Sequence, residues 1–301
     1  MDQIAMPSMA ARPRRRGGLR DLTALIRPGQ WPKNLVVLVP VLEVISPAPD
    51  TLIRAALAAV LFTIASAMVY VGNDLVDAER DRAHPHKRRR PIASGSVGLA
   101  RALLLLAALA AALCVTAFTL AGQPPLLPGL VWPVAVYLLI NAVYTARLKH
   151  VALVDVFTVA CGFVLRLVLG YLVIGRTVQP WLAVCVLAVC LLLVLGKRRH
   201  EVRSSGTDHR PSLAGYTVDY IDHLLVLCAA TTLVSYLLYA RSFGAVAMLT
   251  APCALFCLFR YFQIVVVEAD GGNPTRLLLR DRVILATGLL WFALFEGGIH
   301  G

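Results

Sequence analysis

The sequence predicts an all-α, polytopic membrane protein with nine transmembrane helices and a cytoplasmic N-terminus. Its 301 residues are 58% hydrophobic and only 15% charged, whereas about 25% of residues are charged in a typical soluble domain. The mean hydropathy is +0.73. The apolar residues also gather in runs close to the roughly 20 residues that a helix needs to cross a bilayer. Two soluble domains, which the length alone would allow, are therefore not expected.

The nine expected spans follow one another along the chain. The first is the weakest, because Pro40 and Glu43 interrupt it and a proline removes a helical hydrogen bond. Residues 1–30 are basic and lack a long apolar core, so they predict a cytoplasmic tail rather than a cleaved signal peptide. Residues 31–301 are expected to form a single transmembrane domain. The expected spans are residues 34–49, 52–72, 98–121, 127–146, 152–174, 180–196, 220–240, 243–266 and 282–299.

Basic residues predict the orientation of these spans. Of the 29 Lys and Arg residues, 24 fall in the N-terminal tail and in the loops on the same side of the membrane. Loops rich in Lys and Arg stay in the cytoplasm, so the N-terminus is expected inside and the C-terminus outside. The net charge of +12 therefore lies in membrane-edge loops. A nucleic-acid partner is not expected, whereas an anionic substrate is.

An acidic segment closes the second expected span. Asn73, Asp77 and Asp81 are spaced four residues apart, so that a continuing helix places all three on one face. Three oxygen ligands without Cys or His suit Mg²⁺, which is usually held by one or two carboxylates together with substrate phosphates. The alternative is a charged helix end in which Arg80 and Arg82 neutralise nearby carboxylates. Because ionisable residues at the membrane edge are costly, we favour a binding site for a metal-bound diphosphate over a charged helix end.

A basic run follows this acidic segment, from Lys87 to Arg90. It is expected to anchor the loop on the cytoplasmic side, and Lys87 and Arg88 are also candidates for binding phosphate. His84 and His86 flank Pro85 just before the run. No third His lies nearby, which argues against a transition-metal site.

These motifs resemble those of the UbiA superfamily of intramembrane prenyltransferases. That family carries Asn-Asp-x-x-Asp-x-x-x-Asp after its second span, and this chain matches it fully from Asn73 to Asp81. The resemblance implies a nine-helix bundle whose active site is capped by cytoplasmic loops. It covers nearly the whole chain.

The chain is more specifically similar to the actinobacterial phosphoribosyltransferase branch of this superfamily. After the sixth span, aromatic prenyltransferases of the superfamily carry a second Asp-rich motif that holds a second Mg²⁺. This chain has a cationic segment there instead, from Gly196 to Glu201. Phosphoribosyl pyrophosphate carries a diphosphate at C1, which needs Mg²⁺, and a phosphate at C5, which suits Arg or Lys. The other segments that carry the similarity are Arg27–Asn34, Asp81–Ile92, Leu148–His150 with Asp155, and Leu279–Val283.

This resemblance implies transfer of 5-phosphoribose from phosphoribosyl pyrophosphate to decaprenyl phosphate in the bacterial inner membrane, for cell-wall arabinan synthesis. Mg²⁺ is the implied cofactor, and a homo-oligomer is left open. The first alternative is a UbiA-type aromatic prenyltransferase that uses a prenyl diphosphate, and the second is a transporter, although no internal repeat is evident.

The candidate site residues divide by expected role. Arg166 lies inside the fifth expected span, where it either pairs helices or faces the acceptor phosphate; both readings stay open. Tyr216, Asp219, Tyr220 and Asp222 either line the site or cap the seventh span, and we favour the cap. The candidate metal ligands are Asn73, Asp77 and Asp81, with Asp74 expected to orient the loop. The candidate substrate-binding residues are Lys33, Asn34, Lys87, Arg88, Tyr144, Lys149, Asp155, Arg166, Lys197, Arg198 and Glu201.

Overall fold

Every element is helical in the part of the chain that the computed structural model describes, and no strand occurs there. The structure describes residues 17–83, 85, 87–122, 127–205, 211–269, 271–272 and 274–300. The basic residues Arg12 to Arg16, the two histidines at 84 and 86, and Arg210 lie outside these described residues.

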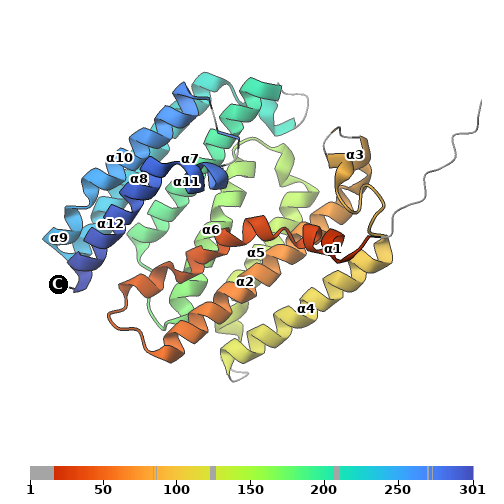
Figure 1. Ribbon diagram of the computed structural model, residues 1–301, viewed down its shortest axis with the longest axis horizontal. Coiled ribbons are helices and arrows are strands. Elements are labelled where there is room, and N and C mark those ends of the chain that lie inside the picture. The colour runs from red at the N-terminus through yellow and green to blue at the C-terminus, as the bar shows by residue number, and fades with distance from the viewer. Residues whose placement is uncertain are drawn as a thin grey trace, which may run out of the picture. The chain divides into compact units, whose positions relative to one another are not determined.

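Seven of the described helices are long and apolar enough to cross a membrane. They correspond to the second to eighth expected spans, so the chain is a multi-span membrane protein. The elements drawn in Figure 1 are α1 (Leu19–Ile26), η1 (Pro28–Glu43), α2 (Pro49–Val76), α3 (Ala78–Ala83), η2 (Lys87–Arg89), α4 (Leu99–Ala121), α5 (Leu127–Ala146), η4 (Leu148–His150), α6 (Val154–Val173), α7 (Pro180–Ser205), η5 (Pro211–Gly215), α8 (Val218–Ala240), η6 (Arg241–Phe243), α9 (Ala245–Met248), α10 (Ala251–Phe262), η7 (Gln263–Val267), α11 (Pro274–Arg280) and α12 (Arg282–His300).

Two expected spans, the first and the eighth, take a different form from the prediction, whereas the ninth is a helix with nearly the predicted bounds. The first is a 3₁₀ helix, η1, with Pro32 and Pro40 inside it, and it is not among the seven. Proline lacks an amide donor and clashes with the preceding turn, which disfavours a regular α-helix here. The eighth is divided into α9, α10 and the π-helix η7. The ninth corresponds to α12, which is also not among the seven spans found in the described residues.

The contacts divide the chain into two compact units, which are described separately. In the first unit, α1 buries Leu25 in a cluster with Val71 and Ile92. The amide of Gly17 donates to the carbonyl of Ser96 at 2.8 Å. The described part of the expected tail is therefore folded against its own unit. The first unit comprises Met1–Gln30 and Ser66–Ala112, and the second comprises Trp31–Ala65 and Leu113–Gly301.

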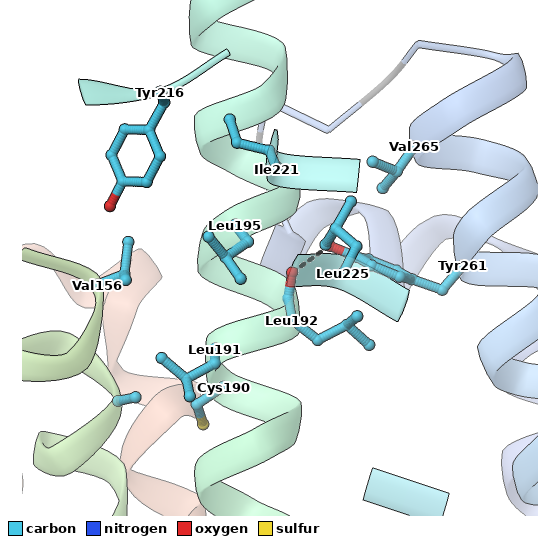
Figure 2. Close-up of a cluster of buried hydrophobic side chains, with 11 residues drawn as sticks. Val156, Cys190, Leu191, Leu192, Leu195, Tyr216, Ile221, Leu225, Tyr261 and Val265 are labelled. Carbon is cyan, nitrogen blue, oxygen red and sulfur yellow. Dashed lines mark hydrogen bonds between the residues drawn. The ribbon is translucent and has the colours of Figure 1, made fainter. Parts of the chain in front are cut away.

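The second unit is organised around α7, which packs against α6 and α8. Figure 2 shows the core formed by these helices and by the end of α10. Within this core, the Tyr261 hydroxyl donates to the Leu192 carbonyl at 3.2 Å. In a membrane, close packing and hydrogen bonds between helices stabilise such contacts. The carboxyl end of α7, which carries the cationic segment, is thus fixed from several sides.

The 3₁₀ helix η1 is held on α6 in the same unit. The buried carboxylate of Glu43 accepts hydrogen bonds from the hydroxyls of Tyr171 and Tyr239, the latter at 2.7 Å. Gly170 of α6 lies so close to η1 that an added Cβ would overlap the carbonyl oxygen of Val37. Glycine at this position therefore permits the close approach of α6 and η1, the helix that carries Lys33.

We predict that Gly170→Ala lowers the stability of the protein. The added methyl group has no room beside the Val37 backbone, and overpacking of this kind costs about 1–3 kcal/mol. The measurement is the thermal unfolding midpoint of the purified protein in detergent. The matched control is Gly288→Ala in α12, where an added Cβ meets nothing within 4 Å and Ala is the better helix former. Equal midpoints for wild type and Gly170→Ala would contradict the tight contact.

Candidate active site

The acidic segment in the first unit forms one continuous helical face. Helix α2 ends at Val76 and α3 begins at Ala78, but the hydrogen bonds continue across the junction. The Asp77 amide donates to the Asn73 carbonyl, and the Asp81 amide donates to the Asp77 carbonyl, both at 2.9 Å. Residues four apart in such a ladder share a face. The structure therefore has the geometry that the spacing predicted.

Two arginines pair with the carboxylates of this segment. Arg27 lies 2.5 Å and Arg90 lies 3.1 Å from the same oxygen of buried Asp74. Arg90 also lies 2.7 Å from buried Asp81. The partner of Asp81 is thus Arg90 rather than Arg82, which sequence reasoning had considered. Asp74 thus holds the first helix and the basic loop together through its ion pairs with Arg27 and Arg90.

The chemistry of this face fits Mg²⁺ shared with a phosphate ligand. Asn73 and Asp77 are partly exposed, and all the candidate donors are oxygens. Among the described residues, no group of three or more His, Cys, Asp or Glu is placed to hold a metal by itself. Mg²⁺ usually takes one or two protein carboxylates and completes its shell with water and substrate phosphates. An open face suits that requirement better than a closed cage.

Cationic residues gather in the second unit, beginning with Lys33 and Arg166. Burial, together with the positive charges of Lys197 and Arg166, lowers the pKa of Lys33 to about 8. Arg166 is buried and donates to the side-chain oxygen of Asn34 at 2.8 Å and to the carbonyl of Gly162 at 2.7 Å.

The guanidinium of Arg166 also lies over three aromatic rings, with distances of 4.7 Å to Phe62, 4.8 Å to Tyr137 and 5.2 Å to Phe163. Cation–π contacts stabilise a desolvated guanidinium. Arg166 therefore pairs α6 with η1 through Asn34, and a role toward the acceptor phosphate stays a prediction.

Arg198 and Asp155 form a buried ion pair between α7 and α6. The two side chains are 3.1 Å apart, and Asp155 is completely buried. Glu201, one turn further along α7, also pairs with Arg198. The structure thus joins Asp155 to Arg198, a pairing that the sequence did not indicate. A buried charge needs such partners, because an unpaired one costs several kcal/mol.

Tyr216 and Ser212 complete the shell around Asp155. The Tyr216 hydroxyl donates to Asp155 at 3.0 Å, and the Ser212 hydroxyl lies 3.4 Å from its other oxygen. Burial and the nearby Asp155 carboxylate raise the pKa of Tyr216 to about 12, so the phenol stays a donor at neutral pH. Tyr216 was expected to cap α8, but the cap is Thr217, which accepts from the Tyr220 amide.

The remaining candidates lie around this cluster or on the exposed loop. Lys197 is 45% exposed and 3.6 Å from Glu201. Tyr144, at the end of α5, and Lys149, in η4, are partly exposed. Lys87 and Arg88 are exposed in η2 of the first unit. The structure thus brings Lys33, Asn34 and Arg166 together, and Asp155, Arg198 and Glu201 together, within the second unit.

Sequence reasoning missed Arg27, Arg90 and Ser212 as members of these clusters. Arg27 and Arg90 lie in segments whose motifs were recognised, but nothing in a run of four basic residues tells which one pairs with a carboxylate. Ser212 carries no sequence signal of its own. Each contact joins residues far apart in sequence or separated by a loop, and only the folded chain selects among them.

The family follows from a comparison over most of the chain. Residues 40–280 match the model of the UbiA prenyltransferase family. The chain belongs to this family. Both polar clusters fall largely within the matched residues, and only Arg27, Lys33 and Asn34 lie before them.

Curated relatives of this UbiA chain carry a more specific name. It is 33% identical to decaprenyl-phosphate phosphoribosyltransferase of Mycobacterium tuberculosis, over 89% of this chain and 90% of that protein. It is 30% identical to the protein of the same name from Mycolicibacterium smegmatis, over 93% and 92% of the two chains.

Solved structures agree with the UbiA fold. A UbiA homologue from Archaeoglobus fulgidus bound to DMAPP and Mg²⁺ matches with a TM-score of 0.69 and 18% identity. The match covers 93% of this chain and 99% of that chain. At this identity the likeness establishes the fold, which is the helical bundle that the sequence resemblance implied.

We predict that kcat/KM falls as the pH rises through about 8, where Lys33 loses its proton. The charged form of Lys33 attracts an anionic substrate and predominates below this pH, whereas the neutral form predominates above it. The pH dependence of kcat/KM reports groups of the free enzyme. Lys33→Arg keeps its charge at every accessible pH, so its alkaline fall should move to higher pH. An unchanged fall in Lys33→Arg would assign it to another group.

Proposed function

We propose that this UbiA-family protein transfers the 5-phosphoribosyl group from phosphoribosyl pyrophosphate to decaprenyl phosphate and releases pyrophosphate. The observation that carries the proposal is the cationic end of α7, where Arg198 is held by Asp155 and Glu201. A prenyl diphosphate would favour a second acidic, metal-binding motif at this position. A donor with an additional phosphate favours fixed arginine and lysine side chains.

The relatives support the same reaction. Two proteins named decaprenyl-phosphate phosphoribosyltransferase align with nearly the whole chain. Their name specifies a phosphorylated lipid and a phosphoribosyl group, and both molecules are anionic. The lysines and arginines described above suit such ligands.

The reaction needs little proton transfer. A phosphate oxygen of the lipid bonds to C1 of the ribose, while the bond from C1 to the pyrophosphate oxygen breaks and its electron pair leaves with pyrophosphate. The attacking phosphate is already anionic, so no general base is required. The ribosyl centre is expected to pass through an oxocarbenium-like transition state. Catalysis then depends mainly on positioning and on charge stabilisation.

Each polar cluster takes a part of this chemistry. Asn73, Asp77 and Asp81 would hold Mg²⁺, which supplies charge neutralisation for the leaving pyrophosphate when bound. Lys197 and Arg198 bind the phosphates of the donor. Further roles fall to Glu201, which binds a ribose hydroxyl or a metal-bound water, and to Lys33, Asn34, Lys87, Arg88, Tyr144 and Lys149, which contact pyrophosphate or the lipid phosphate.

The proposal includes the location of the reaction. The excess of Lys and Arg in alternate loops supports a cytoplasmic location for the N-terminus and for the loops that carry the candidate residues. We place the protein in the inner membrane of a bacterium, where it supplies a precursor of cell-wall arabinan.

The proposal predicts that purified protein with Mg²⁺, radiolabelled phosphoribosyl pyrophosphate and decaprenyl phosphate makes labelled lipid. Asp77→Ala should lower the rate roughly a hundredfold or more, because electrostatic stabilisation of the leaving group is lost. The matched control is Glu79→Ala, an exposed acidic residue two positions away, which should retain activity. Thermal unfolding confirms that each variant is folded.

Two outcomes would contradict this proposal. Full activity in Asp77→Ala would remove the acidic face from the reaction. Wild-type protein that leaves decaprenyl phosphate unlabelled, but joins a prenyl diphosphate to an aromatic acceptor, would assign the alternative UbiA chemistry.

A further inference from the structure

Two neighbouring arginines at the end of α7 have different partners. Arg198 pairs with Asp155 of α6. Arg199 instead pairs with both oxygens of Asp222 in α8, at 2.6 and 3.1 Å. Both arginines are buried, whereas Lys197 is about half exposed. The side chain of Arg199 is therefore fully engaged within the protein.

Arg199 also caps the helix that ends in η7. It donates to the carbonyl of Val265 at 3.0 Å. The final carbonyls of a helix lack partners within the helix, and an arginine there satisfies them and complements the helix dipole. The π-helical form of this turn is seen in the hydrogen bond from the Glu268 amide to the Gln263 carbonyl, at 3.0 Å. Single π-turns are rare and occur frequently at functional sites.

Close packing reinforces this contact on the same side of α7. An added Cβ at Gly196 would overlap the hydroxyl of Tyr261, which itself donates to the Leu192 carbonyl (Figure 2). An added Cβ at Gly271 would lie only 2.6 Å from the Gly196 carbonyl oxygen. The ring of His200 lies 3.0 Å from the Ala269 carbonyl oxygen. The last turns of α7 are thus held by α8, α10 and the chain after η7.

We infer that Arg199 is a positioning residue, which fixes the end of α7 so that Lys197 and Arg198 present their charges to the phosphates of the donor. Arg199 itself does not touch the substrate. This inference rests on the proposed function for the roles of Lys197 and Arg198. Arg199 differs from Arg198 in its contacts, because Arg199 faces α8 and η7, whereas Arg198 faces Asp155 of α6.

Lys33 provides a local reporter of the position of α7. Its pKa is lowered mainly by burial, and then by the charges of Lys197 on α7 and Arg166 on α6, while Cys190 acts in the opposite sense. If the end of α7 moves away from Lys33, the positive charge of Lys197 acts on Lys33 less strongly, and the pKa of Lys33 rises.

The experiment compares Arg199→Gln and Asp222→Asn with wild type, using the full-length protein in detergent. Asp222→Asn is the milder variant, because Asp222 is partly exposed and asparagine keeps one acceptor oxygen. Arg203→Gln, an exposed position on the same helix, is the matched control. For each protein, KM is measured for phosphoribosyl pyrophosphate and for decaprenyl phosphate. The pKa of Lys33 is measured by pH-dependent amine labelling with mass spectrometry.

In both test variants we expect KM for the sugar donor to rise about tenfold, with a smaller change for the lipid. The pKa of Lys33 should rise in both variants. In the double variant, which combines Arg199→Gln with Asp222→Asn, the changes in KM and in the pKa of Lys33 should be close to those of a single variant, because the two residues form one interaction. Arg203→Gln should match wild type in every measurement.

Two results would overturn the inference. An unchanged pKa of Lys33 and an unchanged KM in folded Asp222→Asn, with a large KM effect in Arg199→Gln alone, would mean that Arg199 binds the donor directly. Equal changes in KM and in the pKa of Lys33 for Arg203→Gln would show that the loss of any positive charge from this helix produces them. If the wild type lacks phosphoribosyl transfer, the proposed function fails, and the labelling of Lys33 still decides whether Arg199 positions α7.

Discussion

The ion pair between Asp155 and Arg198 is the interaction on which the second unit depends. Both side chains are buried at the ends of membrane helices, where an isolated charge is costly. The cost is offset because Glu201, Tyr216 and Ser212 supply further polar contacts. One carboxylate therefore fixes α6, α7 and the segment before α8 at a single point.

This constraint extends to the neighbouring backbone. Leu153, just before α6, has a positive φ of 65°, which is uncommon for a residue other than glycine. Its amide donates to the Tyr216 hydroxyl at 2.7 Å, and the same hydroxyl donates to Asp155. Tyr216 thus stabilises an unfavourable turn and the buried charge together. Backbone strain of this kind persists only where the surrounding contacts maintain it.

The two polar clusters differ in the charge that they present. The first unit offers oxygen ligands on one helical face, with Arg27 and Arg90 balancing Asp74 and Asp81. The second unit offers cations, in which Lys33 has a depressed pKa and Arg166 is enclosed by aromatic rings. A donor with a metal-binding diphosphate and a separate phosphate needs both kinds of group.

The sequence predicted the local features and missed the long-range pairings. Seven apolar spans and the helical face from Asn73 to Asp81 follow from hydrophobicity and spacing, which act within one helix. The 3₁₀ form of η1 was not foreseen, although its prolines signalled an interrupted helix. The partners of Asp155 and Arg90 were not foreseen either, because periodicity does not tell which helices meet. The π-turn at η7, whose Val265 carbonyl accepts from Arg199 of α7, was not predicted from any local pattern.

The most direct test of this account is a calorimetric titration of Mg²⁺ and phosphoribosyl pyrophosphate into folded wild-type and Asp155→Asn protein. The amide keeps the shape of the side chain but removes the charge that orients Arg198. The account predicts that affinity for the donor falls about tenfold or more, as expected when a buried charged partner is lost. Unchanged affinity in a folded Asp155→Asn protein would contradict it.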